Sequence, residues 1–242
     1  MGSQNKVSAT PGRTYQEFNN NYAFAALKSD GSVITWGARG SGGDNSSVAS
    51  QLKDVNQIFC NQKAFAALKT DASVISWGDS NSGGDQSSVA SSISNGVEHI
   101  FSTTSAFAAL KNDGSVITWG NSDSGGDSSS VASFLSSGVV NIFSSRDSFA
   151  AIKSDGSVIT WGDSGGGGDS SSVRSSLSSG ISTIFSTGGA FAALKIDGSV
   201  ITWGYSDAAD SSSVASSLSS GVSKIYSTEE AFAALKIDGS VI

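Results

Sequence analysis

The chain has 242 residues with a formal net charge of −7, and 14% of its residues are charged. This length allows one large all-β domain or two small ones, and the low charge excludes the composition of a disordered chain. The negative balance disfavours duplex nucleic acid as a partner, and no apolar stretch is long enough to span a bilayer. Cys60 is the only cysteine, so neither an intrachain disulfide nor a cysteine zinc site can form. The first residues predict no signal peptide, because no basic segment precedes an apolar core.

A repeat of about 42 residues runs through the chain. The five tryptophans are 41, 42, 42 and 42 residues apart. The segment Ala-Phe-Ala-Ala-Leu-Lys-x-Asp-Gly-Ser-Val-Ile, or a close variant, occurs six times and begins at Ala23, Ala64, Ala106, Ser148, Ala190 and Ala231. Self-similarity at this period indicates a repeat architecture such as a propeller or a solenoid.

Each copy begins with a predicted β-hairpin. In the third copy we expect strands at 107–111 and 115–119, joined by an Asp-Gly turn. Asp-Gly between two apolar runs is a strong hairpin signal, because both central residues tolerate positive φ. The second copy has Ala72 where the other copies have glycine, so we expect its hairpin to be strained or to use another turn.

A loop of variable sequence and a serine-rich segment follow each hairpin. In the third copy the segment 128–135 is expected to form a short helix that Asp127 caps at its N-terminus. Val131 and Leu135 are four residues apart and would pack on the core, although serine is a mediocre helix former. A third strand at 139–143 then leads into the next hairpin.

Both faces of the hairpin strands are apolar, which predicts how the copies pack. Phe107 and Ala109 point to one side, and Ala108 and Leu110 point to the other. Because a strand that is buried on both faces needs a layer above and a layer below, each small sheet must lie between two others. Ring closure meets this need without capping repeats.

We therefore predict an all-β fold, a six-bladed β-propeller of ~42-residue repeats, each a three-stranded sheet plus a short helix-like segment. The predicted domain is single and covers 1–242, with repeats at about 14–54, 55–96, 97–138, 139–180, 181–221 and 222–242. The sixth copy stops before its Trp-Gly pair, and we expect the N-terminal stretch Asn5–Thr10 to pair with it and help to close the ring.

The hairpin sequence Ala-Leu-Lys-x-Asp-Gly-Ser-Val-Ile-Thr-Trp-Gly resembles the repeat of the regulator-of-chromosome-condensation propeller family, and the likeness covers every copy. The resemblance implies a propeller that binds proteins through loops on one face. This chain departs from the family pattern where Gly-Gly-Asp replaces Gly-Gln-Leu-Gly, and it offers six blades where seven are usual. No exchange-factor or ligase residue of the family can be transferred to a position here.

Three sets of repeated residues have both structural and functional interpretations. Tryptophans could stack on sugars, aspartates could bind calcium, and lysines could bind anions. For the tryptophans Trp36, Trp77, Trp119, Trp161 and Trp203 we favour a structural core ring, since each ends a doubly buried strand. For the aspartates Asp44, Asp85, Asp127, Asp169 and Asp210 we favour helix caps, because each copy supplies one carboxylate and calcium needs ~6–8 oxygens. For the lysines Lys28, Lys69, Lys111, Lys153, Lys195 and Lys236 we favour neutralisation by the aspartate two residues later.

The sequence offers no catalytic set. His99 is the only histidine, and no serine, cysteine and carboxylate pattern surrounds it. Glu98, Glu229 and Glu230 could form a carboxylate pair, but neighbouring glutamates on a loop are usually solvated. We therefore expect no enzyme activity, no metal and no cofactor.

The variable positions fall in two loops per repeat, one before the hairpin and one after Trp-Gly. Loops on a rigid scaffold are where binding residues usually lie. The candidate partner-binding residues are of types found at interface hot spots, namely Tyr22, Arg39, Lys63, Arg146 and Tyr205. Neutral drift of exposed loops explains the variation equally well.

Three functional hypotheses remain. The first is a non-enzymatic scaffold that binds protein through its loops and acts as a monomer, without nucleic acid or membrane as partner. The second is a lectin-like or small-molecule-binding propeller. The third is an excised or engineered closed propeller from a longer repeat array with no evolved ligand, which the near-identity of the copies favours.

Overall fold

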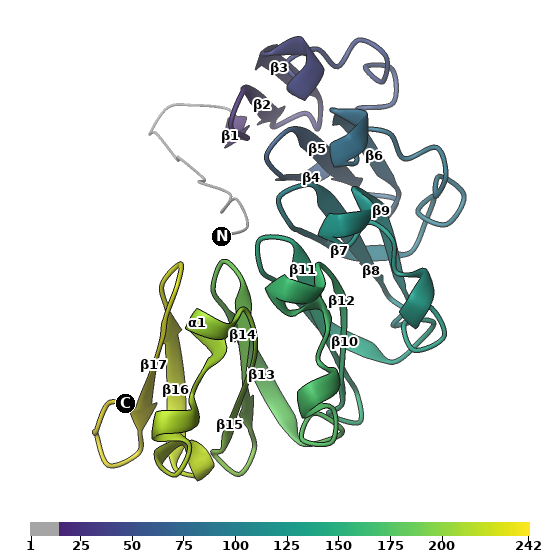
Figure 1. Ribbon diagram of the computed structural model, residues 1–242. Coiled ribbons are helices and arrows are strands. Elements are labelled where there is room, and N and C mark those ends of the chain that lie inside the picture. Colours follow the sequence, from purple (N-terminus) through teal and green to yellow (C-terminus); the bar gives the residue numbers. More distant parts are fainter. Residues whose placement is uncertain (1–14) are drawn as a thin grey trace. The chain divides into compact units, whose positions relative to one another are not determined.

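The computed structural model describes residues 15–242, and its strands form six antiparallel sheets. These residues fall into two compact units, which we call the N-terminal unit (up to Ser128) and the C-terminal unit (Ser129–Ile242). Each unit contains three sheets, and the strands of each sheet follow one another in sequence order (Figure 1). The predicted pairing of Asn5–Thr10 with the sixth repeat lies outside the described residues, and the single domain stays a prediction.

The N-terminal unit contains three sheets of three strands. Their bounds are β1 (Tyr15–Asn19), β2 (Ala23–Lys28) and β3 (Val33–Gly37), then β4 (Val55–Cys60), β5 (Ala64–Lys69) and β6 (Val74–Gly78), then β7 (Val97–Ser102), β8 (Ala106–Lys111) and β9 (Val116–Gly120). Observed and expected strand ends in the third repeat agree within one residue.

The C-terminal unit contains two sheets of three strands and one of two. Their bounds are β10 (Val139–Ser144), β11 (Ser148–Lys153) and β12 (Val158–Gly162), then β13 (Ile181–Ser186), β14 (Ala190–Lys195) and β15 (Val200–Gly204), then β16 (Val222–Ser227) and β17 (Phe232–Lys236). A single bridge between Leu235 and Val241 marks the position of a third strand in the last sheet.

Each hairpin turn uses a three-residue loop in which only the last residue takes the left-handed conformation, and this residue is glycine in every copy except the second. In the first copy the Gly31 amide donates to the Lys28 carbonyl (3.0 Å), and Gly31 has a φ of 77°. The expected positive φ at the aspartate is wrong, because in a three-residue loop only the last residue needs it. Ala72 keeps the same turn at a φ of 63°, which is the strained alternative of the two that we expected.

The serine-rich segments form the expected helix-like segments only as short 3₁₀ turns and other hydrogen-bonded turns. In the third repeat the 3₁₀ turn covers only Ser129–Val131. Serine side chains compete for backbone hydrogen bonds, which shortens the helix. The apolar residues still reach the core, since Leu135 is 1% exposed.

The core lies between consecutive sheets, as the two-faced apolar strands require. Between the second and third sheets, Phe59 and Leu68 meet Phe107 and Trp119, and Ile93 of the connecting segment fills the space between them. The C-terminal unit repeats this packing between its first two sheets, where Ile152 and Leu177 meet Phe191 and Trp203. Each internal sheet therefore buries both faces.

Candidate functional site

The two variable loops of each repeat meet at one end of the sheet, which we call the loop end. The loop after the third strand donates its first amide to a carbonyl of the loop before the hairpin. In the first repeat the Ala38 amide donates to the Tyr22 carbonyl (2.9 Å), and in the fifth repeat Tyr205 donates to Gly189 (2.8 Å). The sequence placed both loops outside the strands, and antiparallel pairing brings them together.

Buried polar side chains hold the two loops in register. The Asn61 amide donates to the Ser82 carbonyl (2.6 Å), and the Thr103 hydroxyl donates to the Ser124 carbonyl (2.8 Å). The residues at this position are Asn20, Asn61, Thr103, Ser145, Thr187 and Thr228. Sequence reasoning missed them, although a hydrogen-bonding residue at the same place in every repeat was a readable signal.

Backbone hydrogen bonds also join the loops of neighbouring repeats within each unit. In the N-terminal unit the Asn21 amide donates to the Gln62 carbonyl (3.2 Å), and the Gln62 amide donates to Thr104 (3.1 Å). In the C-terminal unit Arg146 donates to Gly188 (3.0 Å), and Gly188 donates to Glu229 (2.7 Å). The loop end of each unit is therefore a continuous, hydrogen-bonded rim.

In the N-terminal unit the candidate binding residues form two separate contacts. The Lys63 ammonium lies 5.9 Å from the centre of the Tyr22 ring, and Tyr22 is 54% exposed. The Arg39 guanidinium pairs with the Asp44 carboxylate (2.7 Å). Hydrogen bonds from Ser46 and Arg39 lower the pKa of Asp44 to about 2.

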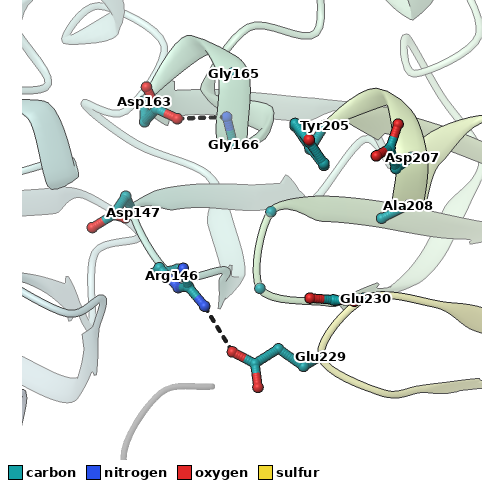
Figure 2. A pocket seen from close by; sticks show the side chains of 12 residues that line it. Arg146, Asp147, Asp163, Gly165, Gly166, Tyr205, Asp207, Ala208, Glu229 and Glu230 are labelled. Atoms are coloured by element: carbon teal, nitrogen blue, oxygen red, sulfur yellow. Dashed lines mark hydrogen bonds and ion pairs between the residues drawn. The ribbon is translucent and has the colours of Figure 1, made fainter.

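In the C-terminal unit, the other two candidates, Arg146 and Tyr205, line one pocket of about 630 Å³. The Arg146 guanidinium pairs with Glu229 (2.7 Å) across one intervening repeat (Figure 2). The remaining lining residues come from the same loops, namely Asp147, Asp163, Gly165, Gly166, Gly188, Gly189, Asp207, Ala208 and Glu230. The structure thus brings together two residues that lie 59 positions apart in the sequence.

Glycines open this pocket. Gly188 and Gly189 stand where the neighbouring repeats have Arg146-Asp147 and Glu229-Glu230. A Cβ at Gly188 would lie 3.1 Å from the Glu229 carbonyl oxygen, and one at Gly189 would lie 3.2 Å from the Tyr205 Cβ. A larger residue at either position would narrow the pocket.

Four of the five tryptophans are buried, namely Trp77, Trp119, Trp161 and Trp203. The indole nitrogens donate to carbonyls of the preceding repeat, from Trp77 to Gly42 (3.1 Å), Trp119 to Gly83 (3.0 Å) and Trp203 to Gly167 (3.1 Å). Trp36 stacks on Phe24 (5.4 Å) as the other tryptophans stack on their phenylalanines, but it differs from them in being 41% exposed. Within the described residues no Gly-Gly loop precedes the first sheet to cover it.

The repeated aspartates accept hydrogen bonds from backbone amides two residues later. Asp85 accepts from Ser87 (2.9 Å) and Asp169 from Ser171 (2.8 Å), and these bonds lower the pKa of both carboxyl groups. Within residues 15–242 no group of three or more His, Cys, Asp or Glu side chains is placed to hold a metal ion.

The six repeated lysines make two kinds of contact. Lys28 and Lys69 pair with the aspartates two residues later (3.2 and 3.4 Å). The other four lysines donate to carbonyls at the end of a serine-rich segment, in the pairs Lys111–Ser92, Lys153–Phe134, Lys195–Ser176 and Lys236–Ser217. For these four the expected aspartate pair is replaced by a bond that holds the connecting segment on the hairpin.

His99 packs between two phenylalanine rings, with ring centres 4.9 Å from Phe59 and 4.7 Å from Phe101. Burial lowers the pKa of His99, while the Glu98 charge opposes this shift. Its surroundings are those of a packing residue.

No family model and no curated protein matches this chain. Among solved structures, it is similar to yeast RCC1 (Prp20) bound to Kap60, with 17% identity and a TM-score of 0.50. That match covers 78% of this chain and 56% of the RCC1 chain.

A second structure of Prp20p from Saccharomyces cerevisiae matches over the same shares at 17% identity and a TM-score of 0.49. The CRINKLY WD40 ectodomain of the receptor kinase ACR4 from Arabidopsis thaliana matches at 12% identity and a TM-score of 0.49, covering 94% of this chain and 78% of that one. The chain thus spans just over half the length of the yeast protein.

In the described part of the chain no helix is long and apolar enough to cross a membrane. The six sheets, the two-sided burial and the likeness to RCC1 agree on the architecture. The chain is a six-bladed repeat β-propeller that resembles the regulator-of-chromosome-condensation type.

Proposed function

We propose that this chain is a non-enzymatic scaffold that binds a protein partner through the loop ends of its sheets. The observation that carries the proposal is the hydrogen-bonded rim, which presents variable side chains on a backbone framework that repeats from sheet to sheet. Tyr205 is 56% exposed there and needs no large rearrangement to meet a partner. Yeast RCC1, which has the same kind of fold, was solved bound to another protein, Kap60.

The absence of enzyme activity is part of the proposal. His99 lies between two aromatic rings, and in the described residues no hydrogen bond joins its side chain to a serine, threonine or cysteine side chain. Nucleophilic catalysis needs a base within hydrogen-bond reach of the nucleophile. We also propose that the chain acts as a monomer and takes neither duplex nucleic acid nor a membrane as its partner, in keeping with its net charge of −7.

A phage-displayed random peptide library panned on the immobilised chain tests the proposal. We expect enriched peptides whose binding falls about tenfold when Arg146→Ala and Tyr205→Ala are combined, because hot-spot residues dominate affinity. The matched control is Ile196→Ser, at the opposite end of the same unit, where Ile196 is 80% exposed. Other copies carry Ser29 and Ser154 at that position, so the control should fold normally.

Other outcomes select other functions. Peptides that lose binding with Ile196→Ser would overturn the loop end as the site. A glycan array that binds while the library fails would favour the lectin-like alternative. Failure of both would favour a propeller with no evolved ligand.

A further inference from the structure

The side chains that line the pocket in the C-terminal unit carry a net negative charge. Five carboxylates line it, and Arg146 is the only cationic side chain among its lining residues. Arg146 already pairs with Glu229 (2.7 Å). Within the described residues no cationic side chain lies within ion-pair distance of Asp163, Asp207 or Glu230. The pocket is therefore complementary to a positive charge.

The shape of the pocket fits a side chain from a partner better than a flat contact. Its volume of about 630 Å³ lies within the range of ligand sites. The walls lack side chains at Gly165, Gly166, Gly188 and Gly189, which leaves backbone and carboxylates facing the space. A long, flexible cationic side chain can enter such a space while its own backbone stays at the rim.

Tyr205 adds an aromatic surface to the charge. Its exposed ring stands beside Gly189, and it belongs to the same loop as Asp207. In Figure 2, Tyr205 and Asp207 lie across the pocket from the Arg146–Glu229 pair, and Glu230 lies between them. Arginine and lysine are attracted both to carboxylates and to the face of a tyrosine ring. The Arg146 charge would repel a second cation, which directs it to the Tyr205 side.

We propose that this pocket binds an arginine- or lysine-bearing segment of the partner protein, with the cation between Tyr205, Asp207 and Glu230. This inference rests on the proposed protein-binding function and specifies that the bound segment of the partner is basic. The loop end of the N-terminal unit has a smaller excess of negative charge, because its variable loops carry the cations Arg39, which pairs with Asp44, and Lys63.

The experiment uses a fluorescein-labelled nonapeptide that contains two arginines and one lysine, with a matched peptide in which glutamine replaces all three. Anisotropy titration of the full chain should show binding of the basic peptide only. Combining Asp207→Asn with Glu230→Gln should weaken binding about tenfold, as expected for loss of charge pairs at an interface.

The matched control combines Asp79→Asn with Asp123→Asn at the loop end of the N-terminal unit. This variant changes the net charge by the same amount and leaves the pocket intact, so it separates the effect of net charge from that of the pocket carboxylates. We expect its affinity to stay within about twofold of the parent chain. Equal weakening by both variants, or equal binding of the glutamine peptide, would overturn the pocket as the site.

Two further results separate this inference from the proposed function. In the first, the library enriches peptides that need Tyr205 but carry no basic residue and still bind the variant with Asp207→Asn and Glu230→Gln. That result would overturn the basic segment and would leave the proposed protein-binding scaffold unaffected. Spermidine binding as tightly as the peptide would overturn a protein segment in favour of a small polyamine. Thermal melts of each variant should match that of the parent chain.

Discussion

The two units share one framework but carry loop ends of different character. The rings of Phe107 and Trp119 in the N-terminal unit lie 5.3 Å apart, as do those of Phe191 and Trp203 in the C-terminal unit. The variable loops of the N-terminal unit carry two positive and two negative side chains, whereas those of the C-terminal unit carry one positive and five negative. The difference shows that packing fixes the sheet residues and leaves the loops free to diverge.

The largest expected effect tests whether the two frameworks are equivalent. Trp119→Ala and Trp203→Ala should each lower the free energy of unfolding by ~3–5 kcal/mol, because each opens a cavity and leaves a glycine carbonyl without its indole donor. Trp36→Ala should cost no more than ~1 kcal/mol, since its ring is already partly solvated. Urea denaturation measures all three.

A loss below about 1 kcal/mol for Trp119→Ala would contradict its assignment to the core. Unequal losses for Trp119→Ala and Trp203→Ala would contradict the equivalence of the two units. The exposed Trp36 is the internal control, because it has the same chemistry without the same burial.

A smaller change in stability is expected at the second hairpin turn, which has alanine where the other copies have glycine. Ala72 holds a φ of 63°, where Gly156 and Gly198 of the C-terminal unit hold 77° and 79°. Ala72→Gly should raise the unfolding free energy by about 1 kcal/mol, since an L-residue is strained in this region. The reverse change, Gly156→Ala, should lower it by more, because its Cβ would lie 2.8 Å from the Gly180 amide nitrogen. No gain from Ala72→Gly would show that the turn relaxes around alanine.

The smallest effect is the pH dependence of the hairpin aspartates. Hydrogen bonds from Ser32 and Lys28 lower the pKa of Asp30 to about 2, and bonds from Ser199 lower the pKa of Asp197. Since the folded pKa lies below the unfolded value of 3.8, the contribution of Asp30 is present above that value and lost as pH falls toward about 2.

Asp30→Asn should therefore flatten the loss of stability in this pH window, measured by urea denaturation at each pH. The effect of Asp30 should be more sensitive to salt than that of Asp197, because Lys28 pairs with Asp30 whereas Lys195 donates to the Ser176 carbonyl. An unchanged pH profile for Asp30→Asn would show that its carboxylate titrates alike in both states.

The sequence determined the repeat, the strands and the two-sided burial, because strands that are apolar on both faces and recur about every 42 residues require each sheet to lie between two others. It also placed the variable loops, since insertions and exchanges are tolerated only outside the sheets. It did not predict the 3₁₀ turns, where serine hydroxyls compete with the backbone, or the carbonyl partners of four lysines.

Only the tertiary structure decided which loop residues meet. Arg146 pairs with Glu229, which lies 83 residues away in the sequence. The backbone hydrogen bonds place the loops of the fourth and sixth repeats on either side of Gly188, which has no side chain to separate them. The same scaffold leaves Trp36 41% exposed while it buries the four tryptophans at the same position of other repeats. Local sequence sets the conformation of each repeat, but contacts between repeats depend on which loop lies beside which, and that register exists only once the sheets have packed.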